Sequence, residues 1–392
     1  MPIEITIPGS KSISNRALLL NALTGNKTTL HNIAPCDDSD YMIAGLEELQ
    51  KPEPKLYTGN AGTSTRFLTA YSTLLEKEIQ IDGDERMRER PILALTEALN
   101  SLGANVESPN GCPPLTIHAQ KLKGGEISIP GDISSQYLSA LLMTLPFTAQ
   151  TSIINIEGEL CSKPYIEITL SLLKDYGITI QNKNFQQFTI EAQQATPPLE
   201  FTVEGDASSA SYIGAYSALH PEKEVKLTNI HKNSIQGDIK FLEYLEKMGC
   251  QIAETIKGPQ KLQSLGTVDM NSTPDLVMTF AVLALFASNP TTITNVSNLR
   301  IKETDRLQAL ENELKKLGAK VSTTNDSITI HPLTEFPKEE IQIATYNDHR
   351  MAMSFAILND ILPIKIIDPT CVSKSYTSFW QDLNKLQSGI SY

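Results

Sequence analysis

Four segments of the chain share one pattern of apolar and polar positions. Apolar residues first recur at spacings of three and four and then alternate with polar ones, which is typical of an amphipathic helix followed by a strand. A glycine separates the two patterns, and glycine readily adopts the left-handed conformation that ends a helix. Each segment is therefore predicted to form a helix, a glycine cap and a strand. The segments are 95–108, 170–181, 241–254 and 310–323.

These segments recur at a nearly constant interval. Their glycines are 74, 72 and 69 residues apart: Gly103, Gly177, Gly249 and Gly318. Residues 106–119 and 321–332 are expected to form hairpins, because turn residues lie at their centres. Further copies of the helix are expected within 42–60 and 375–389, and the first has no room for a hairpin. The pattern thus predicts six βα-rich units, three in each of two domains, with the first unit shortened.

Length and composition fit this organisation. At 392 residues the chain is longer than one hydrophobic core usually supports, and 40% hydrophobic with 20% charged residues is typical of a soluble globular protein. The first residues lack the pattern of an export signal, and the longest apolar stretch, 276–287, is too short to span a bilayer. The five cysteines are scattered and show no paired metal spacing. We therefore expect a cytoplasmic protein that binds neither membrane nor metal.

The basic residues indicate what kind of ligand to expect. A net charge of −12 argues against a nucleic-acid partner, because binding a phosphate backbone requires a broad basic face. Only eight of the 33 basic residues are arginine, and none lies between Arg90 and Arg300. Guanidinium groups bind carboxylate and phosphate through paired hydrogen bonds, which lysine cannot imitate. Their confinement to a few segments predicts a binder of small, multiply charged anions, with structural ion pairs as the alternative.

Some of these segments place polar residues at the start of a predicted helix, where free backbone N–H groups attract an anion. One helix is expected to begin near Asn15. Lys11, Ser12 and Arg16 lie around its start, although exposed basic residues beside an ordinary cap would give the same pattern. Gly62 is expected to let the backbone approach a ligand closely, because it has no Cβ.

Two charged clusters carry further candidates. In the first, three arginines two residues apart would share one face of an extended segment, which is costly unless anions bind there or nearby acidic residues pair with them. These are Arg86, Arg88 and Arg90. In the second, Lys302, Glu303 and Arg306 are expected on one side of a helix, where a surface ion-pair ladder would look the same.

Two aspartates stand at expected helix starts. Asp206 is interpreted as a structural cap or hinge residue. Asp275 is also in the position of an N-cap, and only the charged segments elsewhere favour a catalytic role for it. Arg350 precedes a methionine-rich buried helix, and Lys374 lies in an expected loop.

Together these segments resemble the enolpyruvyltransferase family over nearly the whole chain, and in order. The resemblance implies an α/β fold of two lobes, a two-lobed inside-out α/β barrel with three βα-rich subdomain repeats per lobe and the first repeat shortened. It places the N-terminal lobe at 11–204 and the C-terminal lobe at 205–392, completed by the strand 1–10. The motifs are PGSKSISNR, GNAGTSTR, RMRERPI, SSQY, SKPY, PDLVMT, RIKETDRL and NDHRMAM.

The resemblance also implies an activity. The enolpyruvyl group of phosphoenolpyruvate would move to the 5-hydroxyl of shikimate 3-phosphate, in chorismate and aromatic amino acid biosynthesis, without metal, redox or organic cofactor. The matching positions for shikimate 3-phosphate are Ser12, Arg16, Ser134, Ser135, Gln136, Ser162, Tyr165, Asp275, Asn298 and Lys302. Those for phosphoenolpyruvate are Lys11, Gly62, Arg90, Gln136, Arg306, Arg350 and Lys374. The catalytic positions are Asp275, Glu303 and Lys11. The family further implies a monomer, and glyphosate as an inhibitor in the phosphoenolpyruvate site.

Two alternative functions remain open, and the chain departs from the family pattern at Phe67. Enzymes that transfer enolpyruvate to UDP-N-acetylglucosamine have Lys-Asn where this chain has Lys11 and Ser12. They also carry a reactive cysteine in a mobile loop, whereas this chain has no cysteine between Cys36 and Cys112. A non-catalytic anion-binding protein of the same fold is the other alternative. Phe67 stands where many relatives have proline, which is expected to alter the phosphoenolpyruvate pocket slightly.

Overall fold

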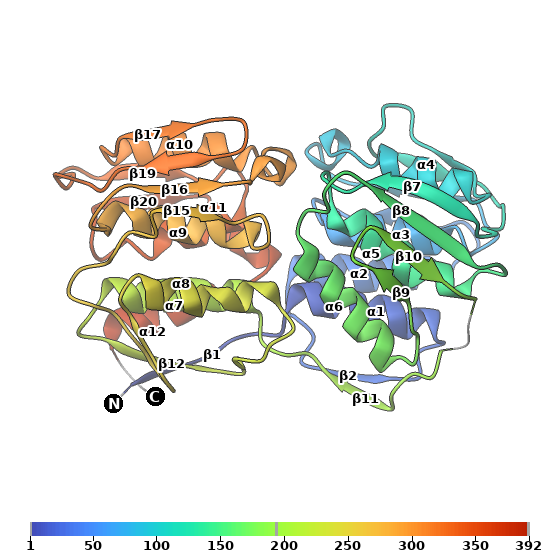
Figure 1. The fold of residues 1–392 in the computed structure, drawn as a ribbon, viewed down its shortest axis with the longest axis horizontal. Coiled ribbons are helices and arrows are strands. Elements are labelled where there is room, and N and C mark those ends of the chain that lie inside the picture. The colour runs from blue at the N-terminus through green and yellow to red at the C-terminus, as the bar shows by residue number, and fades with distance from the viewer. Residues whose placement is uncertain (1, 193–194, 390–392) are drawn as a thin grey trace. The chain divides into compact units, whose positions relative to one another are not determined.

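The computed structural model describes residues 2–192 and 195–389. The chain divides into two compact units, each with its own hydrophobic core. The N-terminal unit runs from Gly9 to Val203. The C-terminal unit begins at Glu204 and also includes the segment that ends at Pro8. Helices and strands alternate along both units (Figure 1).

Two four-stranded sheets of the N-terminal unit repeat one arrangement, with strand orders β3-β4-β6-β5 and β7-β8-β10-β9. In each sheet a helix joins two parallel strands, and a second helix leads into an antiparallel hairpin. The first comprises β3 (Lys55–Tyr57), α3 (Gly62–Ser72), β4 (Ile79–Asp82), the 3-10 helix η1 (Met87–Glu89), α4 (Leu93–Ser101), β5 (Val106–Glu107) and β6 (Leu115–Ile117). The second comprises β7 (Glu126–Pro130), α5 (Ser135–Thr144), η2 (Leu145–Phe147), β8 (Ser152–Glu157), α6 (Lys163–Asp175), β9 (Gln181–Lys183) and β10 (Gln187–Ile190).

The third part of this unit is shorter, as predicted. Its two strands pair in parallel, and among the described residues no strand lies between the end of α2 at Glu48 and the start of β3 at Lys55. There is therefore no hairpin here. The elements are α1 (Lys11–Leu23), β2 (Thr29–His31), α2 (Asp37–Glu48) and β11 (Glu200–Thr202).

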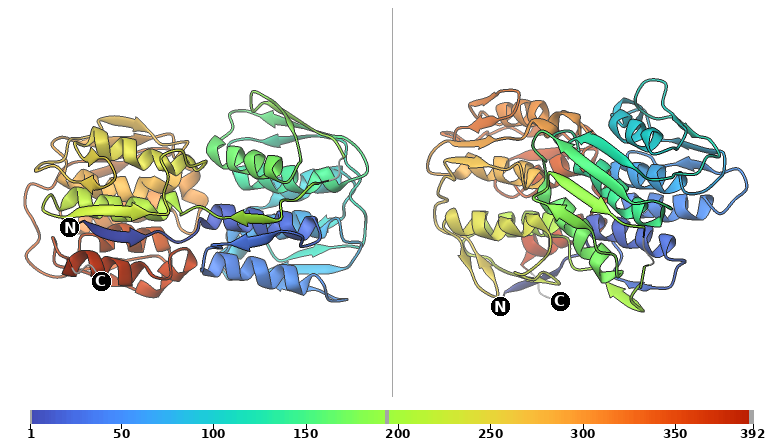
Figure 2. Two further views of the ribbon diagram at one scale, coloured as in Figure 1. Left: turned by 90° about the horizontal axis from the view of Figure 1, so that it is seen from below. Right: turned by 45° about the vertical axis from the view of Figure 1, so that its right-hand side comes forward.

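The C-terminal unit contains two four-stranded sheets and a parallel pair, with orders β1-β12-β14-β13, β15-β16-β18-β17 and β19-β20. The N-terminal strand β1 pairs in parallel with β12, where Ile3 is opposite Val225 (Figure 2). The first sheet uses β1 (Ile3–Thr6), α7 (Ala207–Leu219), β12 (Glu224–Thr228), η3 (Gly237–Lys240), α8 (Phe241–Lys247), β13 (Gln251–Ile252) and β14 (Ile256–Lys257). The second uses β15 (Thr267–Asp269), η4 (Pro274–Leu276), α9 (Val277–Leu283), η5 (Ala284–Phe286), β16 (Thr291–Thr294), η6 (Ser297–Ile301), α10 (Arg306–Lys316), β17 (Val321–Thr323) and β18 (Ile328–Ile330). The parallel pair uses β19 (Ile341–Ala344), α11 (His349–Ala356), β20 (Ile364–Ile367), η7 (Pro369–Lys374) and α12 (Phe379–Ser388).

The repeat predicted from the sequence is confirmed at its glycines. Gly103, Gly177, Gly249 and Gly318 follow α4, α6, α8 and α10, and their φ angles are +97°, +75°, +99° and +90°. Residues with a side chain rarely adopt this left-handed backbone conformation, so glycine ends these helices at the lowest conformational cost. Both predicted hairpins form as well, β5 with β6 and β17 with β18.

Each unit buries a central helix on all sides. Every residue of α3 is buried, and so is every residue of α7 from Ala207 to Ala218. Some of its hydroxyl side chains can be buried because they donate to backbone carbonyls one turn earlier: Thr65 to the Ala61 carbonyl at 2.9 Å and Thr69 to the Thr65 carbonyl at 2.7 Å. The other elements of the unit therefore pack around all sides of the helix that begins at Gly62.

Candidate active site

In the N-terminal unit the helix α1 carries the first candidate residues. It begins at Lys11, not near Asn15 as predicted, because the turn at Ser10 already has the extended backbone of an N-cap. The Lys11 ammonium lies 3.1 Å from a carboxylate oxygen of Asp38, and both side chains are largely buried. The ion pair with Asp38 therefore places the Lys11 ammonium at the start of α1. Ser12 follows at the partly exposed start of the same helix.

Arg16, by contrast, points into the core of this unit. Its guanidinium donates hydrogen bonds to Thr169 Oγ1 at 2.8 Å, Ser139 Oγ at 3.0 Å, the Ser12 carbonyl at 2.8 Å and the Tyr165 carbonyl at 3.2 Å. Burial lowers the pKa of Arg16 to about 10, which leaves it charged at neutral pH. Most of its donors are thus used to tie α1 to α5 and α6.

Gly62 and Arg90 face one another at the start of α3. The Arg90 guanidinium is buried and donates to the carbonyl of Asn60 at 3.1 Å and to its side-chain oxygen at 3.0 Å. A Cβ added at Gly62 would lie 2.5–2.9 Å from the three outer atoms of that guanidinium. Gly62 therefore provides the space in which the Arg90 fork lies, at a helix start that also offers backbone N–H groups.

The predicted common face of three arginines is wrong. The segment is a 3-10 helix, η1, and not extended, so the side chains diverge. Arg86 pairs with Glu89 at 2.8 Å and Arg88 with Asp82 at 2.6 Å, both at exposed positions. Arg90 is the buried member. The alternative of pairing with nearby acidic residues therefore holds for two of the three.

The starts of α5 and α6 hold the remaining candidates of this unit. Ser134 caps α5 by accepting a hydrogen bond from the Gln136 backbone N–H at 3.2 Å, and Ser135 is buried. The Gln136 side chain donates to Thr63 Oγ1 at 3.1 Å, which joins α5 to the start of α3. Ser162 precedes α6 with a φ of +54°, an unusual conformation for serine that is found mostly at constrained positions. Tyr165 lies in the first turn of α6.

In the C-terminal unit, Asp275 lies between two arginines. Its carboxylate oxygens are 2.7 Å from Arg350 Nη2 and 3.1 Å from Arg306 Nη1. Asp275 lies within η4, after the N-cap position at Thr273, and its carboxylate forms ion pairs with these two arginines. Arg306 also binds Glu303 at 2.9 Å and Asp348 at 2.7 Å. Burial lowers the pKa of Arg306, but the three carboxylates outweigh burial and hold its pKa above the ordinary value.

Around this cluster the structure differs from the sequence prediction in two respects. Lys302 and Glu303 are not on a helix with Arg306, because η6 ends at Ile301 and α10 begins at Arg306. The turn still brings Glu303 to Arg306, and the Lys374 ammonium lies 3.9 Å from the other Glu303 oxygen. Lys374 belongs to η7, not to a loop.

Asn298 completes the set in η6. Its side chain is 6% exposed, and neither its amide oxygen nor its amide nitrogen has a hydrogen-bond partner within residues 2–192 and 195–389. A buried amide without partners costs free energy unless a ligand or water satisfies it. The Asn298 amide therefore keeps hydrogen-bonding capacity for a water or a ligand.

Comparison with known proteins identifies the family of the chain. The family model of EPSP synthase (3-phosphoshikimate 1-carboxyvinyltransferase) matches residues 2–383. The chain belongs to the EPSP synthase family. A 3-phosphoshikimate 1-carboxyvinyltransferase of Shewanella baltica is 45% identical, covering 98% of this chain and 96% of the relative, and one of Haemophilus influenzae is 42% identical over 97% and 96%.

The fold agrees with that family. The solved structure of EPSP synthase from Acinetobacter baumannii is similar with a TM-score of 0.78 at 21% identity, and the match covers 98% of this chain and 96% of that one. The predicted two-lobed α/β fold and the family resemblance are both confirmed.

Some residues that surround the EPSP synthase motifs were not found from the sequence. Tyr212 in α7 accepts a hydrogen bond from Arg350 Nη1 at 3.2 Å, and burial raises the pKa of this tyrosine to about 12. Asp238 is buried and bonded to Ser208, and burial together with the charge of Asp275 raises the pKa of Asp238 to about 7. Neither carried a sequence signal, since each lies within a segment that reads as an ordinary helix or helix start. Asp206, by contrast, is the predicted cap: it accepts from the Ser209 N–H at 2.7 Å.

No metal-binding group is found in the described part of this EPSP synthase family member. Within residues 2–192 and 195–389, no three or more His, Cys, Asp or Glu side chains are grouped to hold an ion. In the same residues, no helix is both long enough and apolar enough to cross a membrane.

Proposed function

We propose that this chain transfers the carboxyvinyl group of phosphoenolpyruvate to the 5-hydroxyl of shikimate 3-phosphate and releases phosphate, a step of chorismate and aromatic amino acid biosynthesis. The observation that carries the proposal is the Asp275 cluster, where two buried arginines are held among carboxylates in a chain of this family. Buried arginine forks are suited to phosphate and carboxylate, and both substrates carry both groups.

The proposed contacts to shikimate 3-phosphate come from both units. In the N-terminal unit they are hydroxyl and amide groups at helix starts, which can donate to phosphate and hydroxyl oxygens. In the C-terminal unit Asn298 supplies an unsatisfied buried amide. Arg16 is assigned to hold α1 in place through its buried hydrogen bonds, besides any direct contact. The full set is Ser12, Arg16, Ser134, Ser135, Gln136, Ser162, Tyr165, Asp275, Asn298 and Lys302.

The proposed contacts to phosphoenolpyruvate are cationic groups and one glycine. Arg90 presents its fork beside the Gly62 helix start, and Arg306, Arg350 and Lys374 supply charge in the C-terminal unit. Arg306 and Arg350 pair with Asp275, and Lys374 lies beside Glu303, so an incoming anion would compete with these carboxylates for cations that are already positioned. The full set is Lys11, Gly62, Arg90, Gln136, Arg306, Arg350 and Lys374.

The proposed chemistry moves protons through two groups, Asp275 and Glu303. The 5-hydroxyl oxygen bonds to C2 of phosphoenolpyruvate while its proton leaves to Asp275 and the C3 methylene gains a proton from Glu303. The tetrahedral adduct then loses a methyl proton back to Glu303 as the C2–O bond to phosphate breaks, and the departing phosphate takes the proton that Asp275 received. Lys11 supports the charge on the reacting oxygens. General acid–base transfer of this kind contributes about 10²–10⁴-fold to rate.

The assignment can be tested by following phosphate release. Purified protein should release phosphate when phosphoenolpyruvate and shikimate 3-phosphate are both present, and not with either alone. Release with UDP-N-acetylglucosamine in place of shikimate 3-phosphate would instead assign the sister activity. Binding of both anions without any release would identify a non-catalytic protein of the same fold. We further propose a cytoplasmic monomer, and sedimentation analysis of the purified chain tests the monomer.

A further inference from the structure

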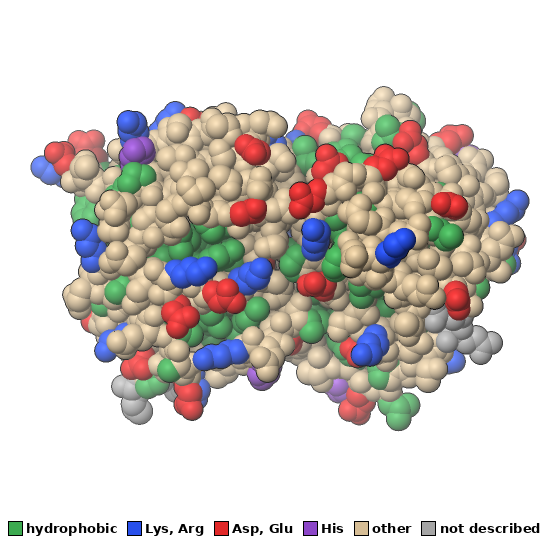
Figure 3. Space-filling model, viewed as in Figure 1, with side chains coloured by type: hydrophobic (Ala, Val, Ile, Leu, Met, Phe, Trp, Pro, Cys, Tyr) green, Lys and Arg blue, Asp and Glu red, His purple; other side chains and the backbone are tan. Residues whose placement is uncertain are grey.

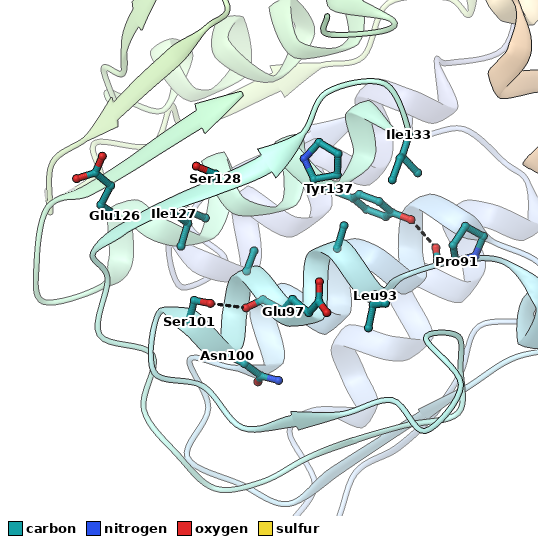
Figure 4. Close-up of a pocket in the computed structure, with 13 residues that line it drawn as sticks. Pro91, Leu93, Glu97, Asn100, Ser101, Glu126, Ile127, Ser128, Ile133 and Tyr137 are labelled. Carbon is teal, nitrogen blue, oxygen red and sulfur yellow. Dashed lines mark hydrogen bonds between the residues drawn. The ribbon is translucent and has the colours of Figure 1, made fainter. Parts of the chain in front are cut away.

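A ligand-sized groove lies in the N-terminal unit, between helix α4 and strand β7 (Figure 4). Its cavity volume is about 990 Å³, within the range of small-molecule sites. Apolar side chains form much of its lining, among them Ala94, Ala98, Ile127 and Ile133. Such a surface favours a ligand with an apolar body.

The groove is acidic. Glu97 of α4 and Glu126 of β7 line it, and no lysine, arginine or histidine is among the lining residues. The Glu126 carboxylate accepts a hydrogen bond from the Asn155 side chain at 2.9 Å and points to the face of β7 away from Ile127 (Figure 4), so Glu97 is the acidic side chain that is available to a ligand on the α4 side. Acidic and basic side chains are interspersed on the face drawn in Figure 3, so a lining without basic residues is a local feature of the groove. A cationic ligand fits it and an anionic one does not.

The backbone of β7 adds further acceptors, because β7 is the edge strand of its sheet. On the β8 side, the Gly125 carbonyl accepts from Ile153 and the Gly131 N–H donates to Glu157, both at 2.9 Å. Backbone groups alternate between the two sides of a strand, so those of the even-numbered residues from 126 to 130 face away from β8. All three line the groove, and Pro130 contributes a carbonyl but no N–H. Acceptors therefore outnumber donors along this edge.

We propose that this groove binds an organic cation: a primary amine attached to an aromatic or aliphatic body. The ammonium group would donate to the Glu97 carboxylate and to strand carbonyls, and the body would cover the apolar lining.

The groove is also connected to Arg90. Pro91 and Tyr137 line it, and the Tyr137 hydroxyl donates to the Pro91 carbonyl at 2.5 Å, as Figure 4 shows. The same carbonyl accepts from Arg66 Nη2 at 2.8 Å. These two bonds fix the residue that directly follows Arg90. An amine that contacts Tyr137 or Pro91 would therefore change how Arg90 is held. It would then also change the KM for phosphoenolpyruvate, an expectation that rests on the proposed function.

Binding is tested with phenethylamine and its neutral analogue 2-phenylethanol, by calorimetric or NMR titration of the whole protein without substrates. Phenethylamine should bind saturably and the alcohol more weakly. Glu97→Gln should weaken the amine about fivefold, the factor that corresponds to one exposed ion pair. Glu53→Gln, which changes an exposed glutamate outside the groove, is the matched control and should have no effect. Equal binding of amine and alcohol, an unchanged affinity of Glu97→Gln, or no saturable binding would each overturn the proposal.

The connection to Arg90 is tested by steady-state kinetics with the same amine. Saturating phenethylamine should change the KM for phosphoenolpyruvate at least twofold and leave that for shikimate 3-phosphate unchanged. Tyr137→Phe should still bind the amine but lose most of this effect. Amine binding with no change in either KM would refute the connection to Arg90. If the enzyme made no product even without amine, the proposed function would fail instead, and the binding titration would still decide the groove.

Discussion

Replacing Gly62 with alanine should weaken phosphoenolpyruvate binding by displacing Arg90. The sequence argument placed the new methyl group against the ligand, whereas the structure places it 2.5–2.9 Å from the Arg90 guanidinium. Carbon contacts are normally about 3.5–4.0 Å, so the guanidinium must retreat by about 1 Å. The end of a flexible side chain can do so at little cost to folding. Its bonds to Asn60, at 3.0 and 3.1 Å, would then be too long to persist.

The expected size follows from the loss of one charge-assisted hydrogen bond to the substrate. Such a bond contributes about 1.5–3 kcal/mol, which corresponds to a rise in the KM for phosphoenolpyruvate on the order of 10- to 100-fold. The turnover number and the KM for shikimate 3-phosphate should change much less. Glyphosate, which the family resemblance places in the same site, is longer than phosphoenolpyruvate. It should lose more affinity, so Gly62→Ala should be glyphosate-tolerant.

The assay is initial-rate phosphate release at saturating shikimate 3-phosphate, with phosphoenolpyruvate varied and glyphosate as the competitor. Arg90→Lys supplies the matched control, because it removes the planar fork. If Gly62→Ala acts through Arg90, it should have little further effect in the Arg90→Lys background. Fully additive effects of the two substitutions on KM would refute this reasoning, and so would a Gly62→Ala enzyme with unchanged KM and glyphosate sensitivity.

Three further predictions follow from the described contacts. Glu303→Gln should lower turnover by about 10²–10⁴-fold with little change in shikimate 3-phosphate affinity, and near-normal turnover would remove Glu303 from the mechanism; exposed Glu335→Gln is the control. Arg16→Lys should lower the free energy of unfolding by about 2–4 kcal/mol in denaturant titrations, since its buried bonds to α5 and α6 are lost, whereas Arg86→Lys should change it by less than about 1 kcal/mol. The raised pKa of Asp238, about 7 against an ordinary 3.8, means that the folded state retains a proton that the unfolded state releases. Stability should therefore fall as pH rises between these two values. Relative to the parent, Asp238→Asn should gain thermal stability from about pH 5 to 7 and no further above about pH 7. A difference in melting temperature that is the same at every pH would contradict this prediction.

The order of elements was largely predictable because its signals are local. A helix that ends in glycine and leads into a strand depends on residues within a few turns of each other, and the positive φ angles after α4, α6, α8 and α10 agree with that pattern. Where the prediction was wrong, at Arg86 to Arg90 and at Lys302 to Glu303, the segments are short turns whose conformation neighbouring elements decide.

The sequence by itself determined the six repeated units, the shortened first unit, the family and the segments that hold its charged residues. Only the tertiary structure decided which of those residues meet. Arg16 is bonded to Thr169, 153 residues away, while Arg90 lies over the glycine that begins α3 and Asp275 joins two arginines from different elements. The physical reason is the separation along the chain over which each effect acts. Backbone conformation follows from neighbours along the chain, but the strength of an ion pair or hydrogen bond depends on burial and on partners that only folding brings together.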